Sequence, residues 1–483
     1  MPVDARQAAV GRVRDVEARS AAFRRELGLG DLVLTQILYV VGSAWVGTAA
    51  KLGSDSLVFW LLAAALYYLP QAAVVIFLSR IMPIEGGLYQ WTAAAFGEFA
   101  GYLVAWNLWA YAILVLAEFG VVIATNLSYL IAAIDPAFAV TPSYTLIVST
   151  GMIGAITFVA VYGLRIGKWV QNVGGAAQFL TFGALIVVPF VALRRGTLSS
   201  FRPLAMTMPA VSLLSLNIFG KMALGAFSGF EYVAILAGEC RNPARLIGRS
   251  VLIAVPIIVL MFVLGTGSVI ALVPAARIDL VSPIPQALTA GFQGMGIARL
   301  IVPILVLTLV MRQVGNSTLI FAGTARLPMV AGWDGLLPAW FTRLSPRFRT
   351  PVNSILVVGA LTIAFVMAGQ IGVGLQEAFQ LLENAAGIFY AFAYIALFAI
   401  PIWAADRLPE RPPTWLRLAS MAGFAVSVLY SVLSVFPIID VPSWRTFAAK
   451  IIAVLVGANL LGLVIYEVAR RRGVNSRRLP PPA

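Results

Sequence analysis

The chain has 483 residues, of which 60% are hydrophobic and 11% charged, with a mean hydropathy of +0.92 and a net charge of +14. Because soluble domains carry about 25% charged residues, this composition excludes a soluble fold and predicts an all-α polytopic membrane protein surrounded by the lipid bilayer. With no histidine and one cysteine, Cys240, the sequence lacks a Ser-His-Asp triad, a histidine or thiolate metal site and an internal disulfide, so we expect no enzyme, metal or cofactor.

Residues 1–30 are polar and basic, and no short apolar stretch with a small-residue cleavage site precedes the first long span, which predicts a cytoplasmic arm. A membrane helix needs about 20 mainly apolar residues. Twelve segments meet this need: 31–50, 57–79, 97–127, 144–162, 171–193, 211–237, 251–272, 297–325, 352–369, 376–403, 415–437 and 444–469.

The basic residues lie mainly in the short loops between these spans. With the N-terminus inside, 24 Lys and Arg residues fall on the inner side and 8 on the outer side. The positive-inside rule therefore predicts that both termini are cytoplasmic, in a plasma (inner) membrane. Since the positive charge reports topology, we expect no nucleic-acid partner.

Glycine-rich segments interrupt the first and sixth spans, at 41–47 and 220–230. Either one alone is explained as well by helix packing, but two breaks five spans apart match the inverted repeat of secondary transporters, with a substrate site between them. Free N–H groups suit a carboxylate and free carbonyls suit an ammonium group, which together describe an amino acid. We expect 42–45 and 226–230 to be non-helical and to face one cavity.

Three stretches resemble the amino acid-polyamine-organocation (APC) transporter superfamily, in a likeness that covers nearly the whole chain. They are 83–91, similar to the family's inner re-entrant loop; 227–231 followed by 237–245; and 334–338 followed by 350–352. The resemblance implies two inverted halves of five helices, 31–193 and 194–403, then two outer helices within 404–469 and a basic tail at 470–483. It also implies alternating access by rocking of the broken helices.

The resemblance further implies the substrate contacts. They are Gly42, Ser43, Ala44 and Trp45 in the first break and Gly225, Ala226, Phe227, Ser228 and Gly229 in the sixth. Trp45 stands where the family usually has a small aliphatic residue, and Gly225 stands where its arginine exchangers carry a tryptophan that stacks on substrate. Trp45 either replaces that wall from the opposite side or is a packing or lipid-facing aromatic.

Ionisable side chains at membrane depth are costly and are candidates for function. Glu118 in the third span is interpreted as a site for substrate recognition or proton carriage, or else as a structural partner of Lys221 or Arg312. Glu231 matches a glutamate tied to gating or protonation in the arginine exchangers; the alternative is a carboxylate that accepts bonds from unwound backbone. Glu383 and Asn384 are weaker candidates.

Two residues bear on whether transport is coupled to a cation. The resemblance places Gln178 where proton-dependent relatives have a lysine and where sodium sits in sodium-coupled relatives. Arg312 in the eighth span brings a permanent positive charge, which acts poorly as a proton carrier but well as a substitute for a bound cation. We therefore predict transport that does not depend on sodium.

The sequence as a whole predicts a secondary active transporter of amino acids or related organic amines, either an antiporter or a proton symporter. Cationic amino acids or polyamines are favoured because the buried anions are Glu118 and Glu231. No Gly-rich phosphate-binding motif of an ATP pump is present. The alternatives are a neutral amino acid exchanger and, less favoured, a non-transporting sensor or membrane-embedded enzyme with the same fold. Protons are a candidate coupling ion, and the question of an accessory subunit stays open.

Overall fold

The structure is a computed structural model. It describes residues 27–84, 86–135, 137–162, 164–198, 204–235, 240–296, 298–333, 337–348, 350–370 and 374–471, and also residue 11. Within these residues the fold is helical, and the one extended pairing is a single bridge between Leu27 and Cys240. The prediction of an all-α membrane fold is confirmed.

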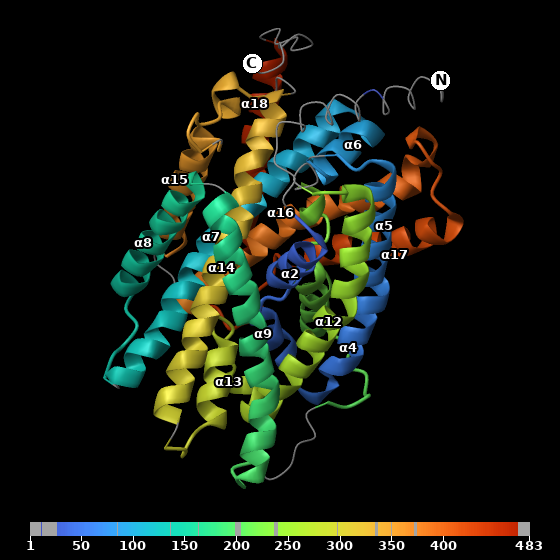
Figure 1. Cartoon of the computed structure of the whole chain (residues 1–483). Coiled ribbons are helices and arrows are strands. Elements are labelled where there is room, and N and C mark those ends of the chain that lie inside the picture. Colours follow the sequence, from blue (N-terminus) through green and yellow to red (C-terminus); the bar gives the residue numbers. More distant parts are fainter. Residues whose placement is uncertain are drawn as a thin grey trace.

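The helices run mostly along one direction, with α2 in the middle of the molecule and α8 and α15 along one edge (Figure 1). Their bounds are α2 Leu29–Val40, α3 Ser43–Ala50, α4 Ser56–Ala63, α5 Leu69–Ile81, α6 Leu88–Phe96, α7 Glu98–Ile134, α8 Pro142–Val161, α9 Leu164–Arg194, α10 Leu213–Gly220, α11 Tyr232–Ile235, α12 Pro243–Leu272, α13 Pro283–Gly291, α14 Ala298–Trp333, α15 Val352–Gly369, α16 Leu375–Trp403, α17 Thr414–Leu433 and α18 Trp444–Arg471. Two π-helical turns, η2 (Ala64–Tyr68) and η3 (Lys221–Ala226), continue α4 into α5 and extend α10. Short 3-10 turns lie at η1 Gly53–Asp55, η5 Ala275–Arg277, η6 Ala339–Thr342 and η7 Ala405–Arg407.

In the described part of the chain, ten helices are long and apolar enough to cross a membrane. The pair α2 and α3, bent by 44°, makes an eleventh span. The sixth predicted span is a shorter apolar helix, Leu213–Ala226. The structure therefore gives ten or eleven helices of spanning length, and the total of twelve stays a prediction.

Both helix breaks are shorter than the sequence suggested. The first is confined to Val41 and Gly42, because Ser43 already begins α3, so the expectation of a non-helical 42–45 is wrong beyond Gly42. In the sixth span the helix continues as the π turns of η3 through Ala226 and ends before Ser228, so the expectation of a non-helical 226–230 is confirmed for 228–230 and wrong for Ala226 and Phe227. The first break thus spans two residues, and the second spans the four residues 228–231 before α11 begins at Tyr232.

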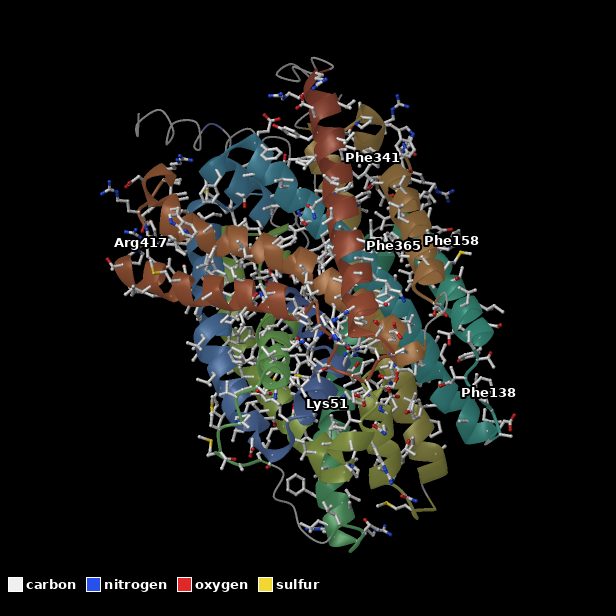
Figure 2. The ribbon with its side chains drawn as sticks, turned by 180° about the vertical axis from the view of Figure 1, so that it is seen from behind. Lys51, Phe138, Phe158, Phe341, Phe365 and Arg417 are labelled. Atoms are coloured by element: carbon white, nitrogen blue, oxygen red, sulfur yellow. The ribbon has the colours of Figure 1, made fainter. Side chains whose placement is uncertain are left out.

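The outer surface carries the apolar side chains expected of a lipid-facing protein. Phe158 on α8, for example, points away from the helices (Figure 2) and is 63% exposed. Helix α18 packs against α7 and α16. Its carbonyls at Ala458 and Gly462 accept hydrogen bonds from Trp106 Nε1 and the Tyr102 hydroxyl, both at 2.9 Å.

Helices α9 and α14, which carry the residues that contact the first break, pack closely against each other. Gly174 and Gly315 meet at the contact, where a Cβ on either would lie 2.9 Å from the Cα of the other. Small residues at such a point let two backbones approach closely in a membrane protein. This contact fixes Arg312 of α14 and Gln178 of α9, each within one turn of a glycine of the pair.

The first prediction tests this contact. Gly174→Leu will lower stability by about 1–3 kcal/mol, because the side chain overpacks a backbone contact. Gly183→Leu on the same helix is the control, since nothing lies within 4 Å of a Cβ there. Thermal unfolding in detergent is the measurement, and equal melting temperatures for the two variants would contradict the close packing of α9 and α14.

Candidate functional site

A cavity lies between the two helix breaks, at the meeting of α2, α3, α7, η3, α14, α16 and α17. Most of the residues predicted to contact substrate line it. These are Gly42, Ser43, Ala44, Trp45, Glu118, Gly225 and Ser228, joined by Arg312. The structure therefore brings residues that are nearly 190 positions apart, Gly42 and Ser228, to one space.

Three predicted substrate residues do not line the cavity. The ring of Phe227 is fully buried on the far side of its helix, stacked at 4.3 Å on the ring of Tyr68. Ala226 is equally buried, and Gly229 lies beneath the ring of Tyr39. The resemblance could not resolve which face of the sixth span points inward, because the π turns of η3 shift the helical register.

The carbonyl oxygen of Val41, freed by the first break, is the meeting point of two predicted coupling residues. Gln178 Nε2 donates to it at 3.1 Å and Arg312 Nη1 at 3.2 Å. The other terminal nitrogen of Arg312 donates to Ser43 Oγ at 3.3 Å and to Gln313. Arg312, only 1% exposed, thus satisfies groups on both sides of the break.

Trp45 spans the gap between the two broken helices. A Cβ at Gly42 would lie 2.6 Å from Trp45 Cδ1, and a Cβ at Gly225 would lie 2.5 Å from Trp45 Cη2. The indole therefore lies against both glycines, and its bulk occupies the space that a side chain at 225 would take. This geometry excludes a lipid-facing position for Trp45, which packs on both glycines and lines the cavity, and its role as a wall that stacks on substrate stays a prediction.

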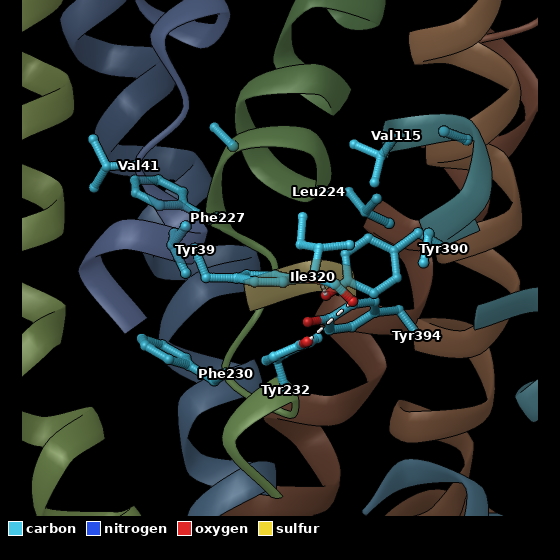
Figure 3. Packing of buried hydrophobic residues seen from close by; sticks show 14 of the residues in the cluster. Tyr39, Val41, Val115, Leu224, Phe227, Phe230, Tyr232, Ile320, Tyr390 and Tyr394 are labelled. Atoms are coloured by element: carbon cyan, nitrogen blue, oxygen red, sulfur yellow. Dashed lines mark hydrogen bonds between the residues drawn. The ribbon is translucent and has the colours of Figure 1, made fainter. Parts of the chain in front are cut away.

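Glu231 lies next to the cavity in a group of tyrosines. Its carboxylate accepts hydrogen bonds from the hydroxyls of Tyr390 and Tyr394, which lie side by side near Tyr232 (Figure 3). The Tyr394 hydroxyl also accepts the backbone N–H of Gly229 at 2.8 Å. The carboxylate is thus held by two side-chain hydroxyls on α16. One of these hydroxyls, that of Tyr394, also binds the backbone N–H of Gly229 in the second break.

Gly229 is required by its own conformation and by its neighbour. Its φ is +135°, in a region that side chains with a Cβ rarely adopt, and a Cβ would lie 2.4 Å from the ring of Tyr39. Tyr39 in turn stacks on Tyr232 at 4.4 Å between ring centroids. The aromatic ring of Tyr39 therefore packs directly against the backbone of the second break.

Two further buried charges, Lys221 and Glu383, form a pair that sequence reasoning missed. Lys221 donates to Asn384 Oδ1, and its Nζ lies 3.6 Å from Glu383 Oε1. The structural alternative for Glu118, a pair with Lys221 or Arg312, is not formed. In the described part of the chain Glu118 makes neither a hydrogen bond nor an ion pair, although it is only 7% exposed. Opposite charges buried in the sixth and tenth spans were the signal that could have identified the Lys221–Glu383 pair.

The cavity wall also includes aromatic residues that no sequence pattern marked. Tyr111 of α7 and Tyr390 of α16 stack at 3.9 Å with ring planes 7° apart, and both line the cavity. Tyrosines are common in membrane helices, so only tertiary packing distinguishes these two.

Comparison with known sequences identifies the family to which this chain belongs. The profile of the family described as amino acid permease matches residues 29–458. The chain belongs to the amino acid permease family. The resemblance to APC transporters is thereby confirmed, and the chain is an integral membrane protein of an amino acid transport family.

Individual relatives agree with this assignment at low identity. The b(0,+)-type amino acid transporter 1 of Mus musculus is 23% identical, over 93% of this chain and 90% of its own. The branched-chain amino acid permease BcaP of Bacillus subtilis is also 23% identical, over 93% of this chain and 94% of its own. Both names describe carriers of amino acids, and neither describes an enzyme.

A solved structure shares the fold of this permease. MhsT in complex with L-phenylalanine matches with a TM-score of 0.60 and 11% sequence identity, covering 85% of this chain and 99% of its own. At that identity the likeness concerns the fold alone.

The second prediction concerns the wall made by Trp45. Gly225→Val will weaken amino acid binding by about tenfold or more, because the new side chain displaces the indole from the cavity. Adding Trp45→Ala to Gly225→Val removes the clash and will restore part of the affinity. Binding is measured by competition against a radiolabelled amino acid in detergent. Wild-type affinity in Gly225→Val alone would show that Trp45 is not part of the wall.

Proposed function

We propose that this permease is a secondary active transporter that moves amino acids or related organic amines by alternating access, favours cationic substrates and does not require sodium. One observation carries the substrate preference: the carboxylate of Glu118 lines the cavity between the broken helices without a partner in the described part of the chain. A buried carboxylate is costly unless a positive charge compensates it. A cationic group on the substrate supplies that charge.

The break in the first span supplies a place for the substrate carboxylate. Helix α3 begins at Ser43 with no side-chain cap, and its first residues line the cavity. The first N–H groups of a helix have no partner within it, and the helix dipole makes that end positive. A carboxylate at this end and an amine near Glu118 together describe the two ends of a cationic amino acid.

Alternating access also requires the arrangement of the whole chain. We propose two inverted halves, 31–193 and 194–403, with the last two helices outside them and both termini in the cytoplasm of a plasma membrane. The paired positions of the two breaks and the excess of inner basic residues support this arrangement. The substrate cavity between the halves is then exposed to each side in turn.

A neutral amino acid exchanger is the second candidate, and the name of the BcaP relative favours it. The two functions are distinguished by counterflow in proteoliposomes. Cationic internal amino acids stimulate uptake of labelled cationic amino acids under the first, whereas only neutral ones do so under the second.

A thermal-shift screen of the purified protein is the direct test of the proposed function. Amino acids and polyamines are added one at a time, and we expect the melting temperature to rise with cationic amino acids or amines. Hits are then assayed for uptake into proteoliposomes. A protein that is stabilised by none of these compounds and exchanges none of them does not have the proposed function.

The third prediction concerns Glu118. Glu118→Gln will weaken binding of cationic substrates by about a hundredfold or more and of neutral amino acids much less, since breaking a buried charge pair on one side costs about 3–5 kcal/mol. Competition binding with matched cationic and neutral amino acids is the measurement. An equal loss for both classes would show that the carboxylate serves the fold rather than the amine.

The fourth prediction concerns sodium and Arg312. Replacing external sodium with choline will leave uptake unchanged, because the guanidinium already binds the Val41 carbonyl where a cation would bind. Arg312→Ala will slow transport more than Arg312→Lys, since lysine keeps the charge but cannot contact Val41, Ser43 and Gln313 together. Uptake is measured in sealed vesicles. Strict dependence on sodium would contradict this role of Arg312.

A further inference from the structure

Three buried charged side chains from three helices lie in or beside the cavity wall. Lys221 is on η3, Glu383 on α16 and Glu118 on α7, and they are 0%, 3% and 7% exposed. Lys221 pairs with Glu383 at 3.6 Å, and Glu118 lines the same cavity as Glu383. We refer to these three residues as the charge cluster.

The charge cluster has one negative charge too many. Lys221 neutralises one carboxylate, which leaves the other uncompensated. Arg312 lines the same cavity, but its terminal nitrogens are bound to Val41, Ser43 and Gln313, and it forms no ion pair with Glu118. Glu231, next to the cavity, is held by the hydroxyls of Tyr390 and Tyr394 rather than by a cation. The other titratable groups that line this space are tyrosine hydroxyls, which stay neutral: Tyr39, Tyr111, Tyr390 and Tyr430.

The hydrogen bonding of the cluster is also incomplete. Among the described residues, neither carboxylate oxygen of Glu383 accepts a hydrogen bond. The amide nitrogen of Asn384 and the hydroxyl of Tyr430 have no partner either. Buried polar atoms are nearly always satisfied, so several unsatisfied ones beside a cavity indicate a place that a polar, positively charged ligand completes.

We propose that the charge cluster binds one positive charge, and that a proton and the cationic group of the substrate occupy it in turn. This inference rests on the proposed function and specifies its coupling. When the cavity holds no amine, the proton resides on a carboxyl group of the cluster. When the amine binds, that proton leaves to the water on the side to which the cavity is open, and a proton from the other side returns after the substrate is released.

The consequence is an exchange of one organic cation for one proton. A second positive charge would meet Lys221 with no carboxylate left to compensate it, so proton and amine exclude each other. A neutral amino acid carries an ammonium group only at its Cα and has no side-chain ammonium to compete for the cluster, so it leaves the proton in place. Transport of cationic substrates is then electroneutral, and transport of neutral ones moves no proton.

Proteoliposomes with a pH-sensitive dye inside test this directly. L-Lysine, and L-leucine as the neutral comparison, are added outside at equal pH on both sides. We expect L-lysine uptake to lower the internal proton concentration, with about one proton leaving per molecule, and an imposed membrane potential to change its rate less than about twofold. We expect L-leucine to cause no proton movement. L-Lysine uptake without proton release and with strong dependence on potential would overturn the proposal.

Charge-matched variants separate the charge count from packing. In Glu383→Gln, Lys221 is left to neutralise Glu118, so both L-lysine uptake and its proton release will fall by about tenfold or more. Adding Lys221→Met to Glu383→Gln restores the single excess charge and will recover much of both. Glu377→Gln is the control, since Glu377 lies on the same helix and pairs with Lys450 away from the cavity. A double variant no better than Glu383→Gln alone, in protein that is folded by its melting profile, would overturn the charge count.

The outcomes also separate the coupling from the proposed function. If the wild-type protein exchanges L-lysine without moving protons, the coupling is wrong and cationic amino acid transport stands. If it exchanges only neutral amino acids, both the preference for cationic substrates and the coupling are wrong, while amino acid transport stands. If it exchanges no amino acid or amine, both proposals fail.

Discussion

A break in a membrane helix frees backbone groups that lipid cannot satisfy, and the interior of this permease is organised around that constraint. The carbonyl of Val41 is bound by Gln178 and Arg312, and the N–H of Gly229 is bound by Tyr394. Each break therefore depends on side chains from helices distant in sequence. The α9–α14 contact at Gly174 and Gly315 brings the backbones that carry Gln178 and Arg312 close together.

Glycine and aromatic residues are paired across the site. Gly225 faces the indole of Trp45, Gly229 faces the ring of Tyr39, and in each case a Cβ would collide with the ring. A wall of the cavity is thus supplied by the first broken helix rather than by the sixth. The shape of the cavity depends on these pairs, because at each contact a large aromatic ring of the first span packs against a glycine of the sixth span.

Charge is distributed unevenly around the same space. At the first break Arg312 is surrounded by oxygen acceptors, whereas Lys221 is shared between Asn384 and Glu383 and leaves Glu118 unpaired. In a low-dielectric interior the cavity therefore meets a positive charge at Arg312 and an excess negative charge at Glu118.

Sequence alone determined the class of the protein and the identity of many residues in the site. Hydropathy located the spans because bilayer thickness sets their length, and the glycines at 42 and 225–229 indicated the candidate site because each glycine weakens a helix. Only the tertiary structure decided the rest. The direction of Phe227, the packing of Trp45 on Gly225 and the choice of Glu383 rather than Glu118 as the partner of Lys221 depend on helical register and on which helices pack together. These are long-range contacts between helices, whereas composition and periodicity report only how each helix meets lipid.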